Sequence, residues 1–308
     1  MPPLTRPRRL AIALALLLCA AVAGCSGGSG AASQGTGPPA TPATPATLPP
    51  TPTPSGEVVS GFVAFGDFGG GKAQVAVARA MERWAADGHR VDALVTTGDN
   101  VYSKGEPEKF RAQLDEPYRQ LRLTRPLWAT LGNHDVQAGH GATQLRYLGL
   151  PDLPFVKELR GVQLLFVDAN RPDQAQADWL EARLSERGPR FRVVVFHQPA
   201  WSCSNHDSTR DVDRFWVPVF ERHKVALILN GHDHNYQRFV SDGGVTYVVT
   251  GGGGKDLYRL DECQGREPPR VALAMRHHFT GVEVRARSLT LTAVADDGAV
   301  LDRAVIER

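Results

Sequence analysis

Two histidines in the stretch LILNGHDHNYQRF (227–239) lie two positions apart. His232 and His234 flank Asp233, directly after an apolar run at residues 225–229. Imidazole and carboxylate groups at the end of a strand can bind a metal ion or carry protons. One such cluster is also typical of a polar loop that ends a strand. Its meaning therefore depends on whether other segments of the chain supply partners.

Four other apolar runs end in residues of the same kind, in the blocks GDFG, GDNVY, GNHD and VVVFH. With the two histidines above, the oxygen and imidazole donors are Asp67, Asp99, Tyr102, Asn133, His197, His232 and His234. Cysteine is absent from this set, which argues against a structural thiolate zinc site and suits Mn, Fe, Zn or Co. Seven donors are too many for one such ion. They suit two ions about 3.5–4 Å apart that share a bridging carboxylate.

Apolar strands and helical segments alternate along the chain, which predicts an α/β domain. Strands are expected at residues 61–65, 93–97, 126–131, 162–168, 191–196 and 225–230. Helices are expected at residues 72–88, 107–121, 173–186 and 211–223, and Asp173 is the expected N-cap of the third. Alternation at residues 277–307 predicts antiparallel strands with a hairpin at 296–298. Because ligands of open α/β sheets bind at the carboxyl ends of the strands, five donor clusters at strand ends indicate one shared site.

The blocks GDFG, GDNVY, GNHD, VVVFH and GHDH resemble, in this order, the five signature blocks of the calcineurin-like metallophosphoesterases. Within that superfamily the chain is most similar to the purple acid phosphatases. Gly69 stands where many members of the superfamily carry a histidine. Tyr102 resembles the tyrosine that takes the place of this histidine in the purple acid phosphatases. The alternative for Tyr102 is a core tyrosine without a metal. The resemblance implies a single catalytic domain with an αββα sandwich. It assigns Asp67, Tyr102 and His234 to a first metal, Asn133, His197 and His232 to a second, and Asp99 to the bridge.

The same resemblance implies hydrolysis of phosphate monoesters by a metal-bound hydroxide, as in an acid phosphatase, with Fe(III) and a divalent Fe, Mn or Zn ion. His134 would act on the leaving-group oxygen, as a general acid or electrostatically, and Asp135 would orient it. His206 lies in a loop that resembles the family's substrate-facing loop. His206 could contact the substrate phosphate, or it could be an ordinary surface histidine.

Weaker candidates lie further along the chain. Asn235 follows the second histidine, and the glycines at residues 251–254 lack the Lys-Ser or Lys-Thr of a P-loop. We expect a close-approach turn there. His277 and His278 precede a strand and are expected to be structural or exposed.

Two other function classes compete with a phosphomonoesterase. A phosphodiesterase acting on nucleotides or glycerophosphodiesters would carry the same five blocks, but the short loops between them favour an open pocket and small monoesters. A surface protein that binds metal or phosphate without turnover would tolerate loss of a donor, whereas this chain keeps all of them. The net charge of +2 gives no signal for a nucleic-acid polymer as partner. The oligomeric state, the export route and the physiological substrate stay open.

The first 56 residues have a different composition from the rest. Residues 1–24 combine arginines with a short apolar run, as a signal peptide does. The last three of them form, with Cys25, the sequence VAGC, which resembles a lipoprotein lipobox. An ordinary signal peptide with a nearby cysteine is the alternative. Residues 25–56, rich in Pro, Thr, Ala and Gly, predict a disordered tether to the catalytic domain at 57–308. The chain is thus expected outside the cytoplasm, anchored to the bacterial cell membrane through lipidated Cys25; a released or periplasmic form is the alternative.

Cysteine usage fits that compartment. Cys19 would leave with the signal peptide and Cys25 would carry lipid, so Cys203 and Cys263 remain as an even pair. In an oxidising compartment we expect them to form one disulfide between two loops. Two free thiols are the alternative.

Overall fold

The structure, a computed structural model, describes residues 55–308. The predicted signal peptide, Cys25 and nearly all of the tether lie outside the described residues, so those expectations stay predictions. Among the helices that are described, none is long and apolar enough to cross a membrane.

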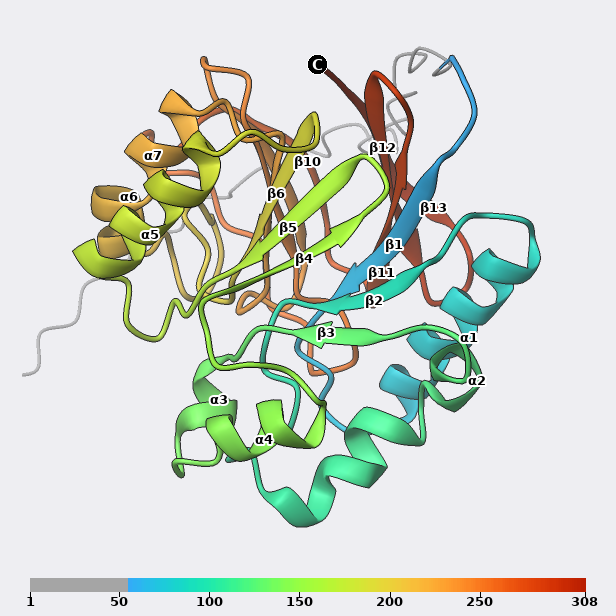
Figure 1. Cartoon of the computed structure of the whole chain (residues 1–308). Helices are drawn as coiled ribbons and strands as arrows, with labels where there is room; N and C mark the ends of the chain where they lie inside the picture. The colour runs from blue at the N-terminus through green and yellow to red at the C-terminus, as the bar shows by residue number, and fades with distance from the viewer. Residues whose placement is uncertain (1–54) are drawn as a thin grey trace, which may run out of the picture. The chain divides into compact units, whose positions relative to one another are not determined.

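The first sheet has six strands in the order β13-β12-β11-β1-β2-β3 (Figure 1). They are β1 (Ser60–Phe65), β2 (Ala93–Thr96), β3 (Leu127–Ala129), β11 (His278–Val284), β12 (Ser288–Ala295) and β13 (Val300–Glu307). Because β1, β2 and β3 run parallel, their carboxyl ends lie along one edge. The antiparallel pairing of β11, β12 and β13 confirms the prediction for residues 277–307.

The second sheet has seven strands in the order β10-β8-β9-β7-β6-β5-β4. They are β4 (Phe155–Leu159), β5 (Val162–Phe166), β6 (Phe191–Val195), β7 (Leu227–Asn230), β8 (Tyr236–Val240), β9 (Thr246–Thr250) and β10 (Arg270–Ala274). β5, β6, β7 and β9 run parallel, and the unpredicted strands β4, β8 and β10 pair antiparallel at the two sides. Each sheet is therefore mixed, with a parallel part that carries the donor blocks.

Both faces of the central strands of the second sheet, β6, β7 and β9, are buried, which explains why these strands are largely apolar. Val193 and Val195 of β6 belong to a large core cluster shared with the first sheet, whereas Val194 packs in a second cluster with residues of α5 (Gln174–Ser185) and α7 (Val217–Arg222). The helix α1 (Lys72–Ala86) packs on β11 and β12 of the first sheet. Two sheets with helices on their outer sides confirm the predicted αββα architecture (Figure 1).

The expected helix caps and boundaries are partly correct. The Asp173 side chain accepts a hydrogen bond from the Gln176 N–H at 3.0 Å, which confirms the N-cap of α5. The single helix predicted at 107–121 is wrong. That segment divides into a 3₁₀ turn (Pro107–Lys109), a π-helical turn (Arg111–Asp115) and α2 (Arg119–Arg122). Pro117, which has no N–H to continue the ladder, lies between the π-helical turn and α2.

Other helical pieces are short. The helix predicted at 211–223 is two helices, α6 (Arg210–Phe215) and α7, with Pro218 in the first turn of α7. Two unpredicted helices, α3 (Asn133–Val136) and α4 (Gly141–Tyr147), follow β3.

The expected disulfide is present. Cys203 and Cys263 are bonded across 60 residues of sequence. The bond joins the segment that carries His206 to the segment after the glycine run.

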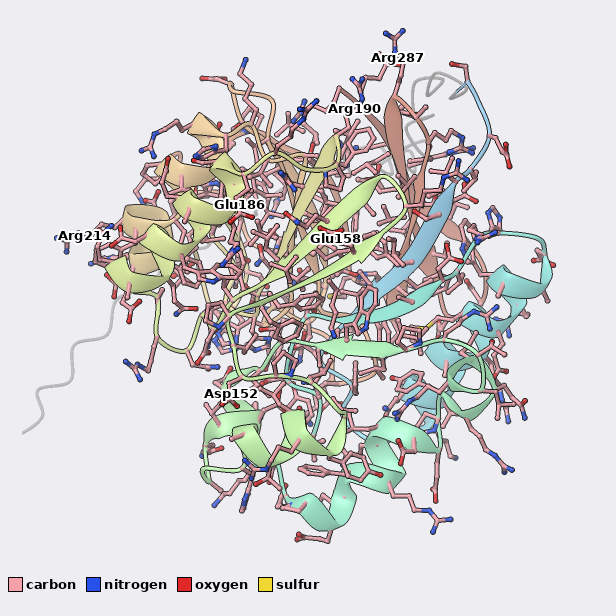
Figure 2. The ribbon with its side chains drawn as sticks, in the orientation of Figure 1. Asp152, Glu158, Glu186, Arg190, Arg214 and Arg287 are labelled. Carbon is pink, nitrogen blue, oxygen red and sulfur yellow. A yellow bond between two sulfur atoms is a disulfide. The ribbon has the colours of Figure 1, made fainter. Side chains whose placement is uncertain are left out.

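Charged side chains of both signs cover the outside of the fold. Arg214 and Arg287 point away from the ribbon, and Asp152 is exposed as well (Figure 2). This mixture is in keeping with the small net charge of the chain.

Candidate metal centre

Three predicted donors follow a strand directly in the left-handed backbone region. Asp67 after β1 has φ 59°, Asp99 after β2 has φ 49° and His232 after β7 has φ 72°. Such strained residues cluster at functional sites. A Cβ at Gly231 would lie 2.5 Å from Asp67 Oδ2, and one at Gly132 would lie 2.1 Å from Asp99 Oδ1. Glycine is therefore required where neighbouring blocks meet.

Asp67, Asp99 and His197 form the buried middle of the donor cluster, with one ligand atom of each within 4.8 Å of the others. Tyr102 donates its hydroxyl to Asp99 Oδ2 at 3.0 Å, and the same hydroxyl lies 3.3 Å from His234 Nε2. His234 Nε2 is 3.5 Å from Asp67 Oδ1. These contacts gather the first predicted set, Asp67, Tyr102 and His234, on one side of Asp99.

The second predicted set gathers around His197. Its Nε2 lies 3.4 Å from Asp99 Oδ1, 3.2 Å from Asn133 Oδ1 and 3.2 Å from His232 Nδ1. Asp99 therefore directs Oδ2 toward the first set and Oδ1 toward the second. The fold brings all seven predicted donors together in the two groups that the resemblance implies.

Backbone carbonyls orient two of the imidazoles. His197 Nδ1 lies 2.9 Å from the Thr97 carbonyl oxygen, and His234 Nδ1 lies 2.7 Å from that of Asp256. Because a carbonyl only accepts, each Nδ1 carries a hydrogen and each Nε2 is turned toward the site. Metal-binding histidines in proteins have this outer hydrogen bond.

The charges of the buried middle depend on a cation. Burial raises the pKa of Asp67 well above its ordinary value. The neighbouring carboxylate of Asp99 also raises this pKa, and His197 lowers it by less than the two together raise it. At Asp99 the neighbouring His197 and His134 outweigh burial and hold the pKa below its ordinary value. The pKa of His197 is raised to about 9, against the effect of burial, by the carboxylates of Asp99 and Asp67. A proton on His197 supplies positive charge that a metal ion would supply in its place.

The remaining donors are held without charge. Burial lowers the pKa of His232 to about 2 and that of His234 to about 4. The pKa of Tyr102 lies far above its ordinary value because of burial and the carboxylates of Asp67 and Asp99. Bare imidazole nitrogens and carboxylates a little over 3 Å apart repel one another unless a cation lies between them. The donor set therefore fits two metal ions.

His134 lies at the edge of this cluster, one-third exposed, with Nε2 3.8 Å from Asp99 Oδ2. Its Nδ1 is held by the Ser103 carbonyl oxygen at 2.6 Å. The prediction that Asp135 orients His134 is wrong for this structure. The buried Asp135 carboxylate instead accepts from the backbone and side chain of Asn100, from the N–H groups of Val101 and Gly132 and from the amide of Gln144.

Asp135 thus joins the second and third donor blocks. Burial, with a further contribution from Asp99, raises its pKa to about 6.

His206 is exposed at the site, and its ring stacks on His232 with centroids 4.0 Å apart. Two residues that sequence reasoning missed lie beside it. Tyr258 contacts His206 and stacks on His234, and the ammonium of Lys255 lies 5.7 Å from the centroid of the Tyr102 ring. We call His134, His206, Lys255 and Tyr258 the rim of the site.

The glycine run explains how two rim residues arrive there. Gly253 donates its N–H to the Gly66 carbonyl at 2.9 Å, and Lys255 donates its N–H to the Asp67 carbonyl at 2.9 Å. The predicted close-approach turn is confirmed, and it was the one sequence signal for Lys255 and Tyr258. Asn235, by contrast, binds Ser204 Oγ at 2.7 Å and supports a loop.

The expectation for His277 and His278 is confirmed at the second residue, which begins β11. His278 is fully buried, and its Nε2 lies 3.1 Å from Thr250 Oγ1. This is a structural position.

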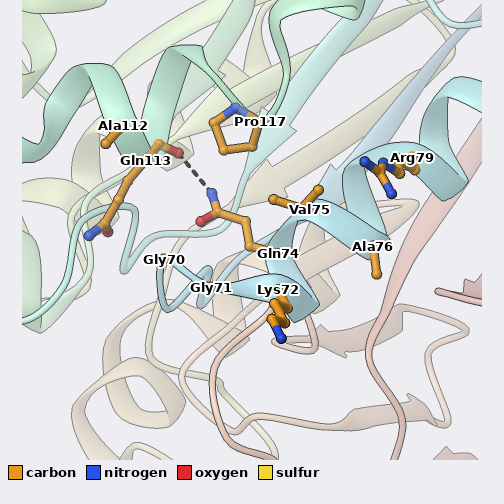
Figure 3. Close-up of a pocket in the computed structure, with 10 residues that line it drawn as sticks. All are labelled: Gly70, Gly71, Lys72, Gln74, Val75, Ala76, Arg79, Ala112, Gln113 and Pro117. Atoms are coloured by element: carbon orange, nitrogen blue, oxygen red, sulfur yellow. Dashed lines mark hydrogen bonds between the residues drawn. The ribbon is translucent and has the colours of Figure 1, made fainter.

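A separate pocket of about 620 Å³ lies between the start of α1 and the segment around Gln113 (Figure 3). None of the seven donors lines it, so it is not the metal site. It borders that site through Gln113, whose side chain accepts from the Tyr102 N–H at 2.9 Å and donates to the Tyr102 carbonyl at 3.2 Å. Gln74 in turn donates to the Gln113 carbonyl at 2.8 Å, as the dashed line in Figure 3 marks.

Comparison with known proteins agrees with this geometry. Residues 61–236, more than half of the chain, match the calcineurin-like phosphoesterase family. Purple acid phosphatase 4 of Arabidopsis thaliana is 28% identical over 244 residues, which cover 68% of this chain and 71% of the relative. Human tartrate-resistant acid phosphatase type 5 is 24% identical over 297 residues, which cover 80% of this chain and 90% of the relative.

Solved structures share the fold. A purple acid phosphatase from seeds of yellow lupin (Lupinus luteus) has a TM-score of 0.70 at 16% identity, over 84% of this chain and 55% of that chain. GAP50, the anchor in the inner membrane complex of Plasmodium, has the same TM-score and identity over 82% of this chain and 89% of that chain. The fold alone therefore does not specify an activity. The match of residues 61–236 shows that this chain belongs to the calcineurin-like phosphoesterase family.

Proposed function

We propose that the chain is a dinuclear metal phosphoesterase that hydrolyses small phosphate monoesters. The observation that carries this proposal is the division of the Asp99 carboxylate, with one oxygen toward Tyr102 and the other toward His197. A carboxylate shared in this way is what two adjacent metal ions require. The purple acid phosphatase relatives support Fe(III) with a divalent Fe, Mn or Zn ion as the pair.

Each residue of the site has a distinct task in this proposal. Asp67, Tyr102 and His234 would hold one ion, Asn133, His197 and His232 would hold the other, and Asp99 would hold both. When bound, the ions lower the pKa of a coordinated water and neutralise charge on the phosphoryl oxygens.

His134 faces the site with Nε2 while Ser103 holds Nδ1, so its ring is fixed in orientation and can deliver a proton to the leaving oxygen. His206, exposed beside His232, is placed to contact the substrate phosphate.

The test uses the purified full-length chain, loaded in turn with Fe, Mn and Zn. Turnover of p-nitrophenyl phosphate is compared with that of bis-p-nitrophenyl phosphate across pH, and metal content is measured in the same samples. Two bound ions and monoester turnover are expected. Asp99→Asn, which keeps the shape of the side chain and removes its charge, is expected to lose one ion or both together with the activity.

Two outcomes would change the assignment. Preferential cleavage of the diester would make the protein a phosphodiesterase. Two bound ions without turnover of either ester would make it a binding protein.

We also propose that the protein works outside the cytoplasm, anchored through lipidated Cys25. The disulfide between Cys203 and Cys263 supports an oxidising compartment. Metabolic labelling with a radioactive fatty acid tests the anchor. Label is expected on the full-length chain and not on Cys25→Ser, and equal labelling of both would refute this anchor.

A further inference from the structure

Lys255 is held at the rim by backbone contacts rather than by its own side chain. Its N–H donates to the Asp67 carbonyl at 2.9 Å, so its main chain is fixed to the first donor block. Its side chain then extends to Tyr102, with Nζ 5.7 Å from the ring centroid. This position places an ammonium group beside a donor of the first metal.

The space for this lysine exists because residue 69 is glycine. A Cβ at Gly69 would lie 2.8 Å from Lys255 Cα, 2.9 Å from its N and 3.1 Å from its Cδ. The φ of +73° at Gly69 also favours glycine. A side chain at residue 69 would clash with the main chain of Lys255, so glycine at this position lets the segment that carries the lysine approach the first donor block.

The charge of this ammonium is little compensated by the protein. The acid that pairs with it is Asp256, at 3.7 Å, whose side chain is 96% exposed. Surface pairs of this kind contribute little. The Lys255 side chain is itself 38% exposed and faces solvent at the site. It therefore remains available to an anionic group on a ligand.

Tyr102 lies between two residues of the rim. Tyr102 contacts both His134 and Lys255, and the proposed proton donor His134 marks where the leaving oxygen departs. Because His134 and Lys255 both contact the Tyr102 ring, we expect a leaving group released at His134 to come near the ammonium.

We propose that Lys255 is a specificity-determining residue that binds an anionic group, a carboxylate or a second phosphate, on the leaving group of the substrate. This inference rests on the proposed phosphomonoesterase function and names the substrate class that the site favours.

The test compares two substrates of similar size, sn-glycerol 3-phosphate and 3-phosphoglycerate, which differ in the charge of the leaving group. The selectivity is the ratio of kcat/KM for 3-phosphoglycerate to that for glycerol 3-phosphate. Lys255→Met is expected to lower this ratio about fivefold, mainly through KM, as loss of one partly exposed ion pair does. Lys255→Arg is expected to keep it. Added salt should lower the ratio in the wild type more than in Lys255→Met.

Lys157→Met is the matched control. Lys157 also lies over an aromatic ring, 5.8 Å from the centroid of Phe155, but on the edge strand β4. Its loss should leave the ratio as in the wild type. An equal fall in kcat/KM for both substrates in Lys255→Met, or loss of bound metal, would overturn the proposal.

A direct binding measurement separates this proposal from the proposed function. Titration calorimetry of the metal-loaded chain with the phosphonate analogues of the same two compounds, which have no phosphate ester to cleave, gives a ratio of Kd values that does not depend on turnover. A Lys255-dependent preference for the 3-phosphoglycerate analogue, without cleavage of either ester, would support the anion site and refute only the phosphatase assignment. The same ratio of Kd values in the wild type and in Lys255→Met would refute the anion site.

Discussion

The ring of Tyr258 stacks on the imidazole of His234, with centroids 3.9 Å apart and an interplanar angle of 15°. Its N–H also donates to the His234 carbonyl at 3.1 Å. One residue thus holds both the backbone and the ring of His234, a proposed donor of the first metal. On the other side, the Asp256 carbonyl holds Nδ1 of the same ring.

Replacing Tyr258 with leucine should weaken binding of the first metal about 10-fold or more, because outer contacts of metal ligands contribute on that scale. Competition against a chelator of known affinity measures this. Tyr258→Phe keeps the ring and is expected to bind metal as the wild type does. Equal affinities for the leucine and phenylalanine variants would show that the stack does not hold His234.

His134→Ala should lower kcat about 100-fold or more while two metal ions stay bound, because the predicted proton donor is lost and none of the seven donors is changed. Turnover and metal content are measured on the same sample. Loss of a metal ion would instead assign His134 to the metal centre. A leaving group of low pKa, which needs no proton, should lose less rate than an alkyl leaving group.

Asp135→Asn should destabilise the fold by about 2–4 kcal/mol, because buried N–H groups of Asn100, Val101 and Gly132 lose a charged acceptor. Urea unfolding of the metal-free protein measures this. The exposed Asp152→Asn is the matched control and should change stability little. Reduced turnover at unchanged stability would support the original prediction that Asp135 orients His134.

The pH dependence of the metal-free protein follows from His197. Its pKa is raised in the folded state to about 9, so its proton stabilises the fold fully below the ordinary value of 6.5. That contribution is lost as the pH rises through 9. The Tm of the metal-free protein should therefore fall between pH 6.5 and 9, and that of the metal-loaded protein should not.

His197→Asn provides the control for this pH effect. Without the titrating ring, the fall in Tm over the same pH range should disappear from the metal-free protein. A fall of the same size in the variant would assign the effect to other groups.

Removing the disulfide should act on stability and on the rim together. Closing a loop of 60 residues contributes about 4 kcal/mol in the chain-entropy model. The double variant Cys203→Ser and Cys263→Ser should lose stability on that scale and raise KM, since the two joined segments carry His206 and Tyr258. Thermal unfolding and steady-state kinetics measure the two effects. An unchanged KM would show that the hydrogen bond from Ser204 Oγ to the Arg259 carbonyl suffices to hold the rim.

The donor blocks could be predicted from the sequence because each occupies a strand end with its own glycine and polar residues. Asp67, Asp99 and His232 are local features of this kind, and the parallel strands bring them together. Two residues of the rim, Lys255 and Tyr258, could not be predicted in the same way. They are brought to the site by backbone pairing between segments nearly 190 residues apart, Asp67 with Lys255, and the glycine run predicts a close approach without indicating its partner.

The prediction that Asp135 orients His134 is wrong for a related reason. Its neighbour in sequence is His134, and a carboxylate beside a histidine commonly orients it. In the short helix α3, however, consecutive side chains point in different directions, and Asp135 turns inward to Asn100 and Gln144. Asp135 is fully buried, so its hydrogen-bond partners are the donors that surround it there. The burial of a single polar residue cannot be predicted from the sequence alone.

The left-handed backbone at Asp67 and Asp99 limits which substitutions evolution can make at these two positions. Asparagine is among the few residues that tolerate that conformation, and it matches aspartate in shape. A single nucleotide change from aspartate to asparagine at either position would remove a carboxylate from the metal centre and leave the turn and its packing in place. Relatives that keep the scaffold and abandon the chemistry are thus one mutation away, and their signature would be an asparagine after the glycine of the first or second block.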